Sequence, residues 1–547
     1  MVLFFAPLLK NPPRGVIFQK CFSKDREFFF IMQKIVEEQK KTINGHGFFD
    51  FGKAAYGTLE IELTGTYNEN IEVVISEEAV DGMIRHTPGW TTFMTERLHL
   101  KNGRHTYRFN IPEHLPAYGG FPHPPTPAEC GGEIAPFRYA EVNHYYGEAV
   151  VRRTVWFDEW NDDASFFESS DEKLNKVWEF CKYSIKATNV FGVYIDGERE
   201  RQPYEADSYI NQLGHFCCDA NYTTARNTID FFEKFPTWPT EWQLITPVLA
   251  RDYWLYSGDR SAVERWLKWL PERLLPEFAG EDGLLRAGRM LKGLNVRDII
   301  DWPQRDRDGY ELGECNFVPN AYYHGACLAM YDLTSDEKYL AQGRQVRTAL
   351  RKAMWRNGMP VDSLESSRTS LHSLVFALRF GIAEAEERAA LAAMIAQKGM
   401  VCSVYGAQFF LECCAGCGQH QLFYDCLTGE GERSWLNMLA QGSTISMEAW
   451  SEFDKPFQDW THAWGAAPAN LIPRYLCGIR PLKPGFQLFS ADVLASAPES
   501  FVLRAPTPCG QIEMAFDGLQ GKLTVPEGTK ALHKGILLDA GTHRVSR

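Results

Sequence analysis

The spacing of apolar residues changes twice along the chain, and these changes constrain the fold more than any other feature. From about Phe48 to Trp156, apolar and polar residues alternate between Gly, Asn and Pro breaks, as in β-strands. After Ser169, apolar residues recur three and four positions apart, as on one face of a helix. Beyond Gly485 the alternation returns. The chain is therefore predicted to be multidomain, in the order β, α, β.

The helical region is predicted to contain about a dozen helices. Val263, Trp266 and Leu270 share one helical face, and similar spacing recurs in segments such as 241–257, 316–333 and 335–355. No strands intervene and no strict repeat of fixed length is visible. These features favour a closed toroid of paired helices over a long bundle or a superhelix.

A chain of 547 residues is too long for one ordinary hydrophobic core. We predict a poorly defined N-terminal segment at 1–44, an N-terminal β-sandwich at 45–168, an (α/α)6 barrel at 169–480 and a small C-terminal β-sandwich at 481–547.

Charge and hydropathy exclude several classes of partner. The formal net charge is −13, which disfavours binding to nucleic-acid phosphates or to an anionic membrane surface. No apolar run is long enough to span a bilayer. The apolar stretch near the N-terminus has no basic residues ahead of it and is a poor secretion signal, so a cytoplasmic or a periplasmic location is expected.

The 14 cysteines are irregularly spaced, which indicates reduced thiols in a core rather than a disulfide framework. Cys413, Cys414, Cys417 and His420 could be offered as a metal site, but they lie in an apolar helical stretch without a second paired motif. Core packing is the favoured interpretation, and we expect no metal or cofactor.

The densest polar cluster lies at residues 194–209, between an apolar segment and a predicted helix. It contains these charged residues: Asp196, Glu198, Arg199, Glu200, Arg201, Glu205 and Asp207. Such a stretch is usually a solvated loop, but the preceding apolar segment and Pro203 indicate a fixed one. Acidic groups held together beside arginines acquire different pKa values, as acid–base catalysis requires.

A second candidate is Glu448, which lies among Met447 and Trp450 with no Lys or Arg beside it in the sequence. Burial of such a carboxylate is unfavourable unless it has a function. Asp301 and Trp302 lie in a further polar loop, and Trp242 lies at a predicted helix start. The motifs of dinucleotide-binding, P-loop, zinc-protease and serine-hydrolase sites are absent from the sequence, whereas paired carboxylates are the equipment of glycoside hydrolysis.

The polar cluster resembles the acidic motif of glycoside hydrolase family 78, the α-L-rhamnosidases. Asp196, Arg199, Glu200, Tyr204 and Asp207 match its order of residues, although Tyr204 stands where a Trp is usual. The spacing from Asp196 to Glu200 is also one residue shorter than in many members. The resemblance implies that Glu200 is the general acid and that the other four residues bind the sugar.

Two further stretches support the resemblance, which covers about residues 45–547. Gly442, Thr444, Glu448 and Trp450 match the segment of the family that carries the general base, which would be Glu448, and the following His matches His462. Two pocket tryptophans of the family match Trp242 and Trp302.

The resemblance implies inverting hydrolysis of terminal α-L-rhamnosides, with a rhamnose-containing glycan or glycoside as the partner. A lyase of similar fold that acts on rhamnosyl–glucuronate linkages and an inactive carbohydrate-binding protein are the alternatives. The oligomeric state is not predicted.

Overall fold

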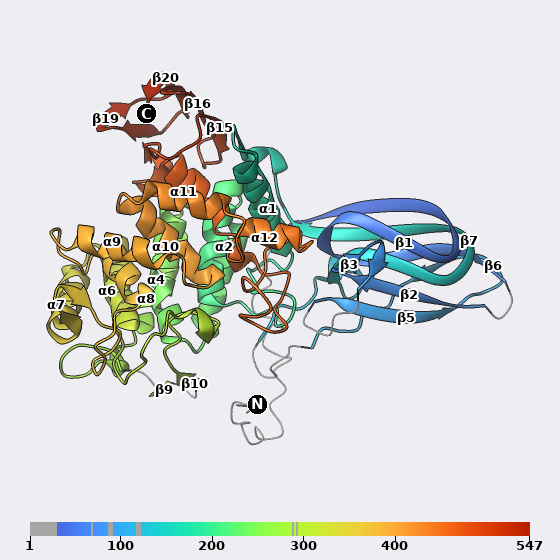
Figure 1. The fold of residues 1–547 in the computed structure, drawn as a ribbon, viewed down its shortest axis with the longest axis horizontal. Helices are drawn as coiled ribbons and strands as arrows, with labels where there is room; N and C mark the ends of the chain where they lie inside the picture. Colours follow the sequence, from blue (N-terminus) through green and yellow to red (C-terminus); the bar gives the residue numbers. More distant parts are fainter. Residues whose placement is uncertain (1–29, 67–68, 86–90, 116–121, 287–288, 292–293) are drawn as a thin grey trace.

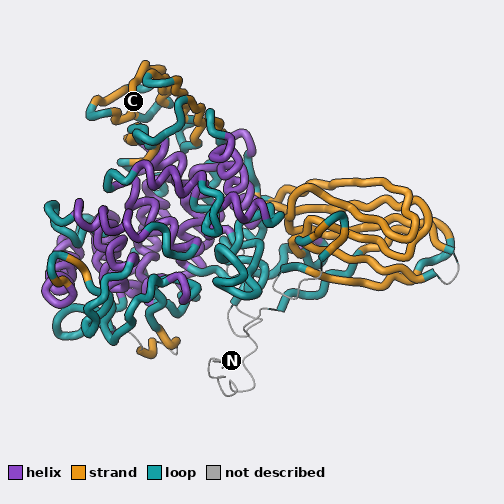
Figure 2. Tube along the Cα trace, viewed as in Figure 1, coloured by secondary structure: helices purple, strands orange, loops and turns teal. Residues whose placement is uncertain are grey.

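The protein is described by a computed structural model that covers residues 30–66, 69–85, 91–115, 122–286, 289–291 and 294–547. The helical domain contacts two β-domains: a large one built from the N-terminal strands lies to its right in the view, and a smaller C-terminal one lies above it (Figures 1 and 2). The predicted order β, α, β is confirmed.

The N-terminal β-domain is built on two long antiparallel strands, β1 (Met32–Gly65) and β7 (Ala135–Asp158). With β2 (Asn70–Ser76), β5 (Phe93–His99) and β6 (Gly103–Arg108) they form one sheet in the order β5-β2-β7-β1-β6. Alternate residues such as Leu59, Ile61 and Leu63 are buried in its core, as the alternating sequence predicts.

This β-domain differs from the prediction in two respects. The strands belong to one continuous sheet rather than to two, because residues 32–43 and 57–63 of β1 pair with the same part of β7 from either side. The domain also begins before residue 45, since β1 starts at Met32; residues 1–29 lie outside the described residues. The alternation before Phe48 is weak because this part of β1 is largely exposed.

The helical domain contains the predicted helices at 241–257, 316–333 and 335–355 as α4 (Thr240–Ser257), α6 (Phe317–Thr334) and α7 (Glu337–Met354). The remaining helices of the region are α1 (Glu172–Thr188), α2 (Glu205–Cys218), α3 (Thr223–Lys234), α5 (Arg260–Trp266), α8 (Leu371–Arg379), α9 (Arg388–Lys398), α10 (Val404–Gly416), α11 (His420–Thr428), α12 (Trp435–Ala440) and α13 (Pro468–Leu471).

Six of these helices contact one another in sequence. Helix α2 packs on α4, α4 on α6, α6 on α8, α8 on α10 and α10 on α13, which returns to α2. Helices α1, α3, α7, α9 and α11 each pack against members of this ring. Cys413 and Cys414 of α10 are buried in the shared core, as the packing interpretation predicts.

The C-terminal β-domain has two small sheets. One runs β13 (Ile479–Pro481), β14 (Leu488–Ala491), β18 (Lys530–His533), β19 (Ile536–Leu538). The other runs β20 (Gly541–Ser546), β17 (Gln520–Val525), β16 (Ile512–Asp517), β15 (Ser500–Ala505), β8 (Phe166–Ser169). Strand β8 was predicted to belong to the N-terminal domain; it pairs with β15 instead, because a four-residue strand carries no sequence signal for its partner.

Phe167 of β8 connects this sheet to the helical domain. Its side chain is 2% exposed, and its ring lies 5.9 Å from that of Trp178 on α1 and 6.3 Å from that of Phe501 on β15. We predict that Phe167→Ala lowers the free energy of unfolding by about 3–5 kcal/mol, because it leaves a cavity between the two domains. Urea unfolding would measure the change. Val502→Ala, at a position of the same sheet that is 44% exposed, should stay within about 0.5 kcal/mol of the native protein; equal losses would contradict the assignment.

Candidate active site

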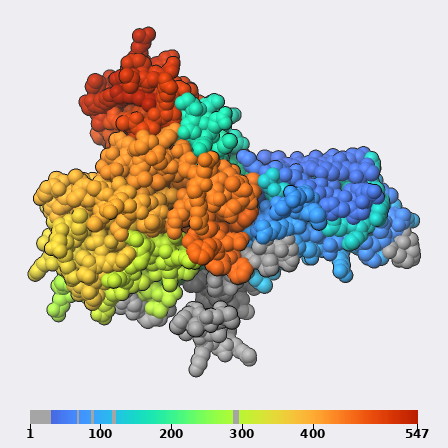
Figure 3. Space-filling view, in the orientation of Figure 1, coloured from blue at the N-terminus to red at the C-terminus, as the bar shows by residue number. Residues whose placement is uncertain are grey.

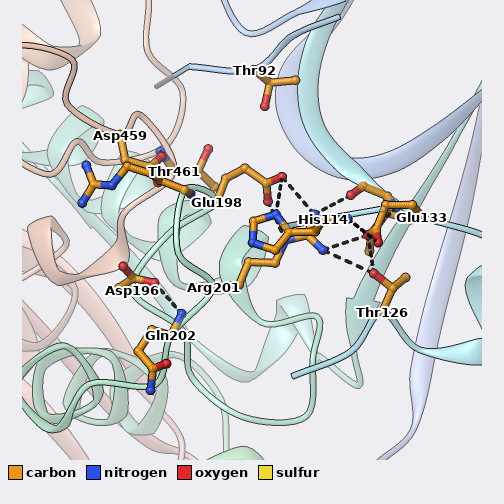
Figure 4. Close-up of polar contacts among 12 residues, drawn as sticks. Thr92, His114, Thr126, Glu133, Asp196, Glu198, Arg201, Gln202, Asp459 and Thr461 are labelled. Atoms are coloured by element: carbon orange, nitrogen blue, oxygen red, sulfur yellow. Dashed lines mark hydrogen bonds and ion pairs between the residues drawn. The ribbon is translucent and has the colours of Figure 1, made fainter. Parts of the chain in front are cut away.

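The predicted polar cluster spans the end of the connection between α1 and α2 and the first turn of α2, which contains Glu205 and Asp207. The backbone N–H of Asp196 donates to the carbonyl of Gln202 (2.9 Å), and the Asp196 carboxylate accepts the N–H of Gln202 (2.8 Å). These two bonds close the loop 196–202 (Figure 4). A Cβ on Gly197 would lie 2.4 Å from Oδ2 of Asp459, so only glycine allows the loop to approach that residue.

Asp459 belongs to the second predicted stretch, which follows α12 and contains Glu448. Its carboxylate accepts the backbone N–H of Arg199 (2.9 Å), and its own N–H donates to Oε2 of Glu448 (3.1 Å). The two stretches, far apart in the sequence, therefore meet at one place in the fold.

The Arg199 side chain joins the two predicted catalytic carboxylates. Its Nη1 and Nη2 each lie 2.8 Å from one oxygen of Glu448, and Nη2 also lies 3.1 Å from Oε1 of Glu200. This is the paired geometry that the planar guanidinium favours with a carboxylate. Since Nη2 lies 3.1 Å from an oxygen of Glu200 and 2.8 Å from an oxygen of Glu448, the two carboxylates lie close together on either side of one nitrogen.

Glu448 is held in its ionised form. Its side chain is 3% exposed, and burial alone would raise its pKa. The charges of Lys455, Arg199 and His462 outweigh burial and hold the pKa of Glu448 far below its usual value. Two contacts to Arg199 and the N–H of Asp459 fill three of the four acceptor positions of this carboxylate, and the ammonium of Lys455 lies against Oε1 as an ion pair without a hydrogen bond.

Glu200 contacts the aromatic part of the site. Its Oε2 accepts the hydroxyl of Tyr204 (2.6 Å), and the Tyr204 ring meets that of Trp242 edge to face at 5.3 Å between centroids. The Trp242 ring in turn lies 6.5 Å from that of Trp464. Burial and the neighbouring Glu200 raise the pKa of Tyr204, so its hydroxyl stays protonated and donates.

Asp196 and Asp207 are buried carboxylates on the same side of the site. Burial and the charges of Glu200 and Asp207 raise the pKa of Asp196. Burial also raises the pKa of Asp207, although His462 Nε2 lies 2.9 Å from its Oδ1 and acts in the opposite sense. The His462 ring packs on Trp464 at 4.7 Å, which connects this pair to the aromatic group.

Trp302 lies on the loop that precedes α6, where it is partly buried against the apolar core of the helical domain. Its backbone N–H donates to the Asp301 carboxylate (2.8 Å). The two preceding N–H groups, of Ile299 and Ile300, bind the carboxylate of Glu241, which adjoins Trp242 on α4. These bonds fix the loop of Trp302 to the first turn of α4, where Trp242 lies.

The sequence interpretation missed Lys455 and Trp464, and it did not single out Asp459. Glu448 was described as having no cation beside it in the sequence, whereas Lys455 and Arg199 both contact it in the fold. Lys455 follows Glu448 only after several intervening residues, and the fold of this loop brings it back to the carboxylate. Trp464 belongs to the same aromatic stretch as His462, so that stretch was the available signal.

Among the described residues, no group of three or more His, Cys, Asp or Glu side chains is arranged to hold a metal ion. No helix in the described part of the chain combines the length and the apolar character needed to cross a bilayer.

The site lies within the region that matches a known sequence family. Residues 162–476, more than half of the chain, match the bacterial α-L-rhamnosidase six-hairpin glycosidase domain. The chain belongs to this family. The resemblance predicted from the acidic and Glu-containing motifs is confirmed, while no curated protein sequence matches the chain.

Solved structures of similar fold agree with this membership. An α-L-rhamnosidase from Streptomyces avermitilis in complex with L-rhamnose has a TM-score of 0.76 at 15% identity, covering 94% of this chain and 54% of its own. One from Dictyoglumus thermophilum has a TM-score of 0.75 at 14% identity, covering 95% and 64%. A GH78 rhamnosidase of Bacillus sp. GL1 has a TM-score of 0.69 at 15% identity, covering 88% and 51%. This family member therefore spans about half to two-thirds of their length.

The low pKa of Glu448 predicts a pH-dependent contribution to stability. The unfolded chain has a Glu pKa of about 4.3, so the folded state gains stability above that pH and loses it as the pH falls toward the folded value. We expect Glu448→Gln to be less stable than the native protein at pH 6, with the deficit shrinking by roughly 1.4 kcal/mol per unit below about pH 4. Urea unfolding at several pH values would measure it.

The matched control is Glu452→Gln, which alters an exposed carboxylate near Glu448 in the sequence. Because Glu452 is exposed, this substitution should change the free energy of unfolding by no more than about 0.5 kcal/mol. A Glu448→Gln deficit that is equally large at pH 3 and pH 6 would show that Glu448 is not held ionised by its neighbours.

Proposed function

We propose that this protein hydrolyses terminal α-L-rhamnosides with inversion of the anomeric centre, with Glu200 as general acid and Glu448 as general base. The observation that carries the proposal is that the Arg199 guanidinium contacts both carboxylates. Glu200 lies in a loop near the start of the helical domain, and Glu448 lies in a loop near its end. Paired carboxylates of distinct environment are what glycoside hydrolysis needs. Membership of the rhamnosidase family supports the sugar specificity.

We further propose that the helical domain is an (α/α)6 barrel. The closed sequence of contacts α2, α4, α6, α8, α10, α13 and back to α2 supports six inner helices, and the family description names six hairpins. The catalytic loop precedes α2, and Trp242 lies at the start of α4, so both project from the same part of this ring.

In the proposed reaction, Glu200 donates its proton to the glycosidic oxygen as the bond to the anomeric carbon breaks. Glu448 removes a proton from the water that attacks the opposite face of the ring. Inverting enzymes usually separate the two carboxyl groups by about 6.5–9.5 Å, whereas here their nearest oxygens are closer and share Arg199. Arg199 therefore fills the space between the two carboxylates, and the water must reach Glu448 at a position that Arg199 does not occupy.

The contact between Lys455 and Glu448 indicates where this water binds. Three acceptor positions of Glu448 hold hydrogen bonds and the Lys455 ammonium lies against Oε1 as an ion pair, so a water can bind Oε1 once this ammonium moves away. Arg199 is held by a two-bond fork and Asp459 donates from the backbone, while Lys455 ends a flexible side chain. We infer that the catalytic water takes the position of the Lys455 ammonium.

The remaining residues form the proposed sugar pocket. Trp242 and Trp302 provide apolar surface for the deoxy ring and its methyl group, while Asp196, Asp207 and His462 bind hydroxyls. Arg199 and Tyr204 orient Glu200. The rhamnose complex of the Streptomyces avermitilis relative supports a sugar site in this fold.

Replacement of either proposed catalytic carboxylate should abolish most of the activity. We expect Glu200→Gln and Glu448→Gln each to lower kcat on an aryl α-L-rhamnoside at least about a hundredfold, the usual size of an acid–base contribution. Glu452→Gln, an exposed neighbour of the base in the sequence, should retain native kcat. Turnover close to native in either active-site variant would refute the role assigned to that residue.

The anomeric form of the product distinguishes the mechanisms. An inverting hydrolase should release β-L-rhamnose first, which then mutarotates, and NMR during the first minutes of turnover would detect it. An α product would exclude inversion. An unsaturated uronate from a rhamnosyl–glucuronate substrate would indicate a lyase, and binding without turnover would indicate an inactive carbohydrate-binding protein.

A further inference from the structure

The residue after the proposed acid points away from the site into the N-terminal β-domain. The Arg201 side chain is 1% exposed, and its Nη1 lies 2.8 Å from the Glu133 carboxylate and 3.3 Å from the Thr126 hydroxyl. Its Nη2 donates to the carbonyl of Ile134 (2.7 Å), and Nε and Nη2 each donate to Glu198 at 2.9 Å. Figure 4 shows the guanidinium held between the catalytic loop and the residues of the β-domain.

This contact holds an unfavourable backbone conformation. Arg201 has φ +48°, in the left-handed region that non-glycine residues rarely adopt. Such a conformation persists only where the surroundings impose it. All five N–H donors of the guanidinium have acceptors, three of the bonds being to the β-domain. Nearby His114 does not compete as a cation, because burial and the charge of Arg201 lower its pKa to about 3.

A second contact joins the β-domain to the loop of the proposed base. Glu77, at the end of β2, is 4% exposed and accepts the hydroxyl of Thr461 (2.5 Å) and the backbone N–H of Thr92 (2.8 Å). The backbone N–H of Thr461 donates to Asp459 (2.8 Å), the residue that binds both Arg199 and Glu448. Figure 3 shows the β-domain as a lobe that meets the late, orange-coloured part of the helical domain.

We propose that the N-terminal β-domain sets the relative position of the acid and base loops, and that Glu133 and Glu77 are positioning residues for the reaction. The proposal rests on the proposed function. Glu133 fixes the loop of Glu200 through Arg201, and Glu77 fixes the loop of Glu448 through Thr461 and Asp459. A displacement of about 1 Å between catalytic groups can lower a rate about a hundredfold, so loss of either contact should reduce kcat.

The charge on Glu77 provides a test that a merely structural role would not pass. Burial and the nearby carboxylates of Asp459 and Glu198 raise the pKa of Glu77 to about 8, and Tyr56 is the other titratable group beside it. At pH 6–7 Glu77 is therefore neutral, and glutamine is close to it in shape and charge. Above pH 8 the ionised Glu77 repels Asp459.

The experiment compares full-length Glu133→Ala, Glu77→Ala and Glu77→Gln on an aryl α-L-rhamnoside. We expect both alanine variants to lose at least about tenfold in kcat with a smaller change in KM. We expect the activity of the native protein to fall above about pH 8, and we expect Glu77→Gln to keep native kcat at pH 6–7 and to lack that fall. The matched control is Glu141→Ala, which removes another buried carboxylate of the β-domain, one that binds the N–H of Ile84.

The control should lower the melting temperature without lowering kcat. Alanine variants that melt earlier but keep native kcat at 25 °C would overturn the proposal, as would a Glu77→Gln variant as impaired as Glu77→Ala. Amide hydrogen exchange of residues 196–202 and 459–462 gives a readout that does not depend on catalysis. It should increase in Glu133→Ala and Glu77→Ala respectively. If the native protein shows no turnover, the proposed function fails while exchange still tests the contacts; unchanged exchange overturns them.

Discussion

The structure of the site depends on the pairing of Arg199 with Glu448. Both side chains are nearly excluded from solvent, and a buried charge without a partner costs several kcal/mol. The carboxylate is therefore stable there only because the acid loop delivers a guanidinium in the geometry that it binds best. Glu200 contacts Nη2 of the same guanidinium. One interaction thus brings together two loops that are distant in the sequence, and it places both proposed catalytic groups around one cation.

The domains that surround this pair are not independent units. Strand β8 completes a sheet of the C-terminal domain before the first helix begins. The N-terminal β-domain contributes acceptors for Arg201 and for Thr461, which lie in the acid and base loops. The N-terminal β-domain thus contacts both loops of the site, while the C-terminal domain is completed by a strand that precedes the first helix.

Much of this arrangement could be predicted from the sequence because local patterns record which side of an element is buried. The helices at 241–257 and 316–333 and the alternation around Leu59 were predicted correctly because burial there repeats at the period of the element. The early part of β1 could not be predicted because it is largely exposed. The partner of the strand at Phe166–Ser169 could not be predicted because four residues are too few to show a period.

The sequence by itself determined the order of the domains, the types of their elements and the family motifs in which Glu200 and Glu448 lie. Only the tertiary structure decided which polar groups meet: Lys455 with Glu448, Glu133 with Arg201, and Glu77 with Thr461. The physical reason is that a hydrophobic period depends on neighbours within a few residues, whereas an ion pair or a buried hydrogen bond depends on two surfaces packing together. The two residues of such a pair therefore share no pattern in the sequence that would identify them as partners.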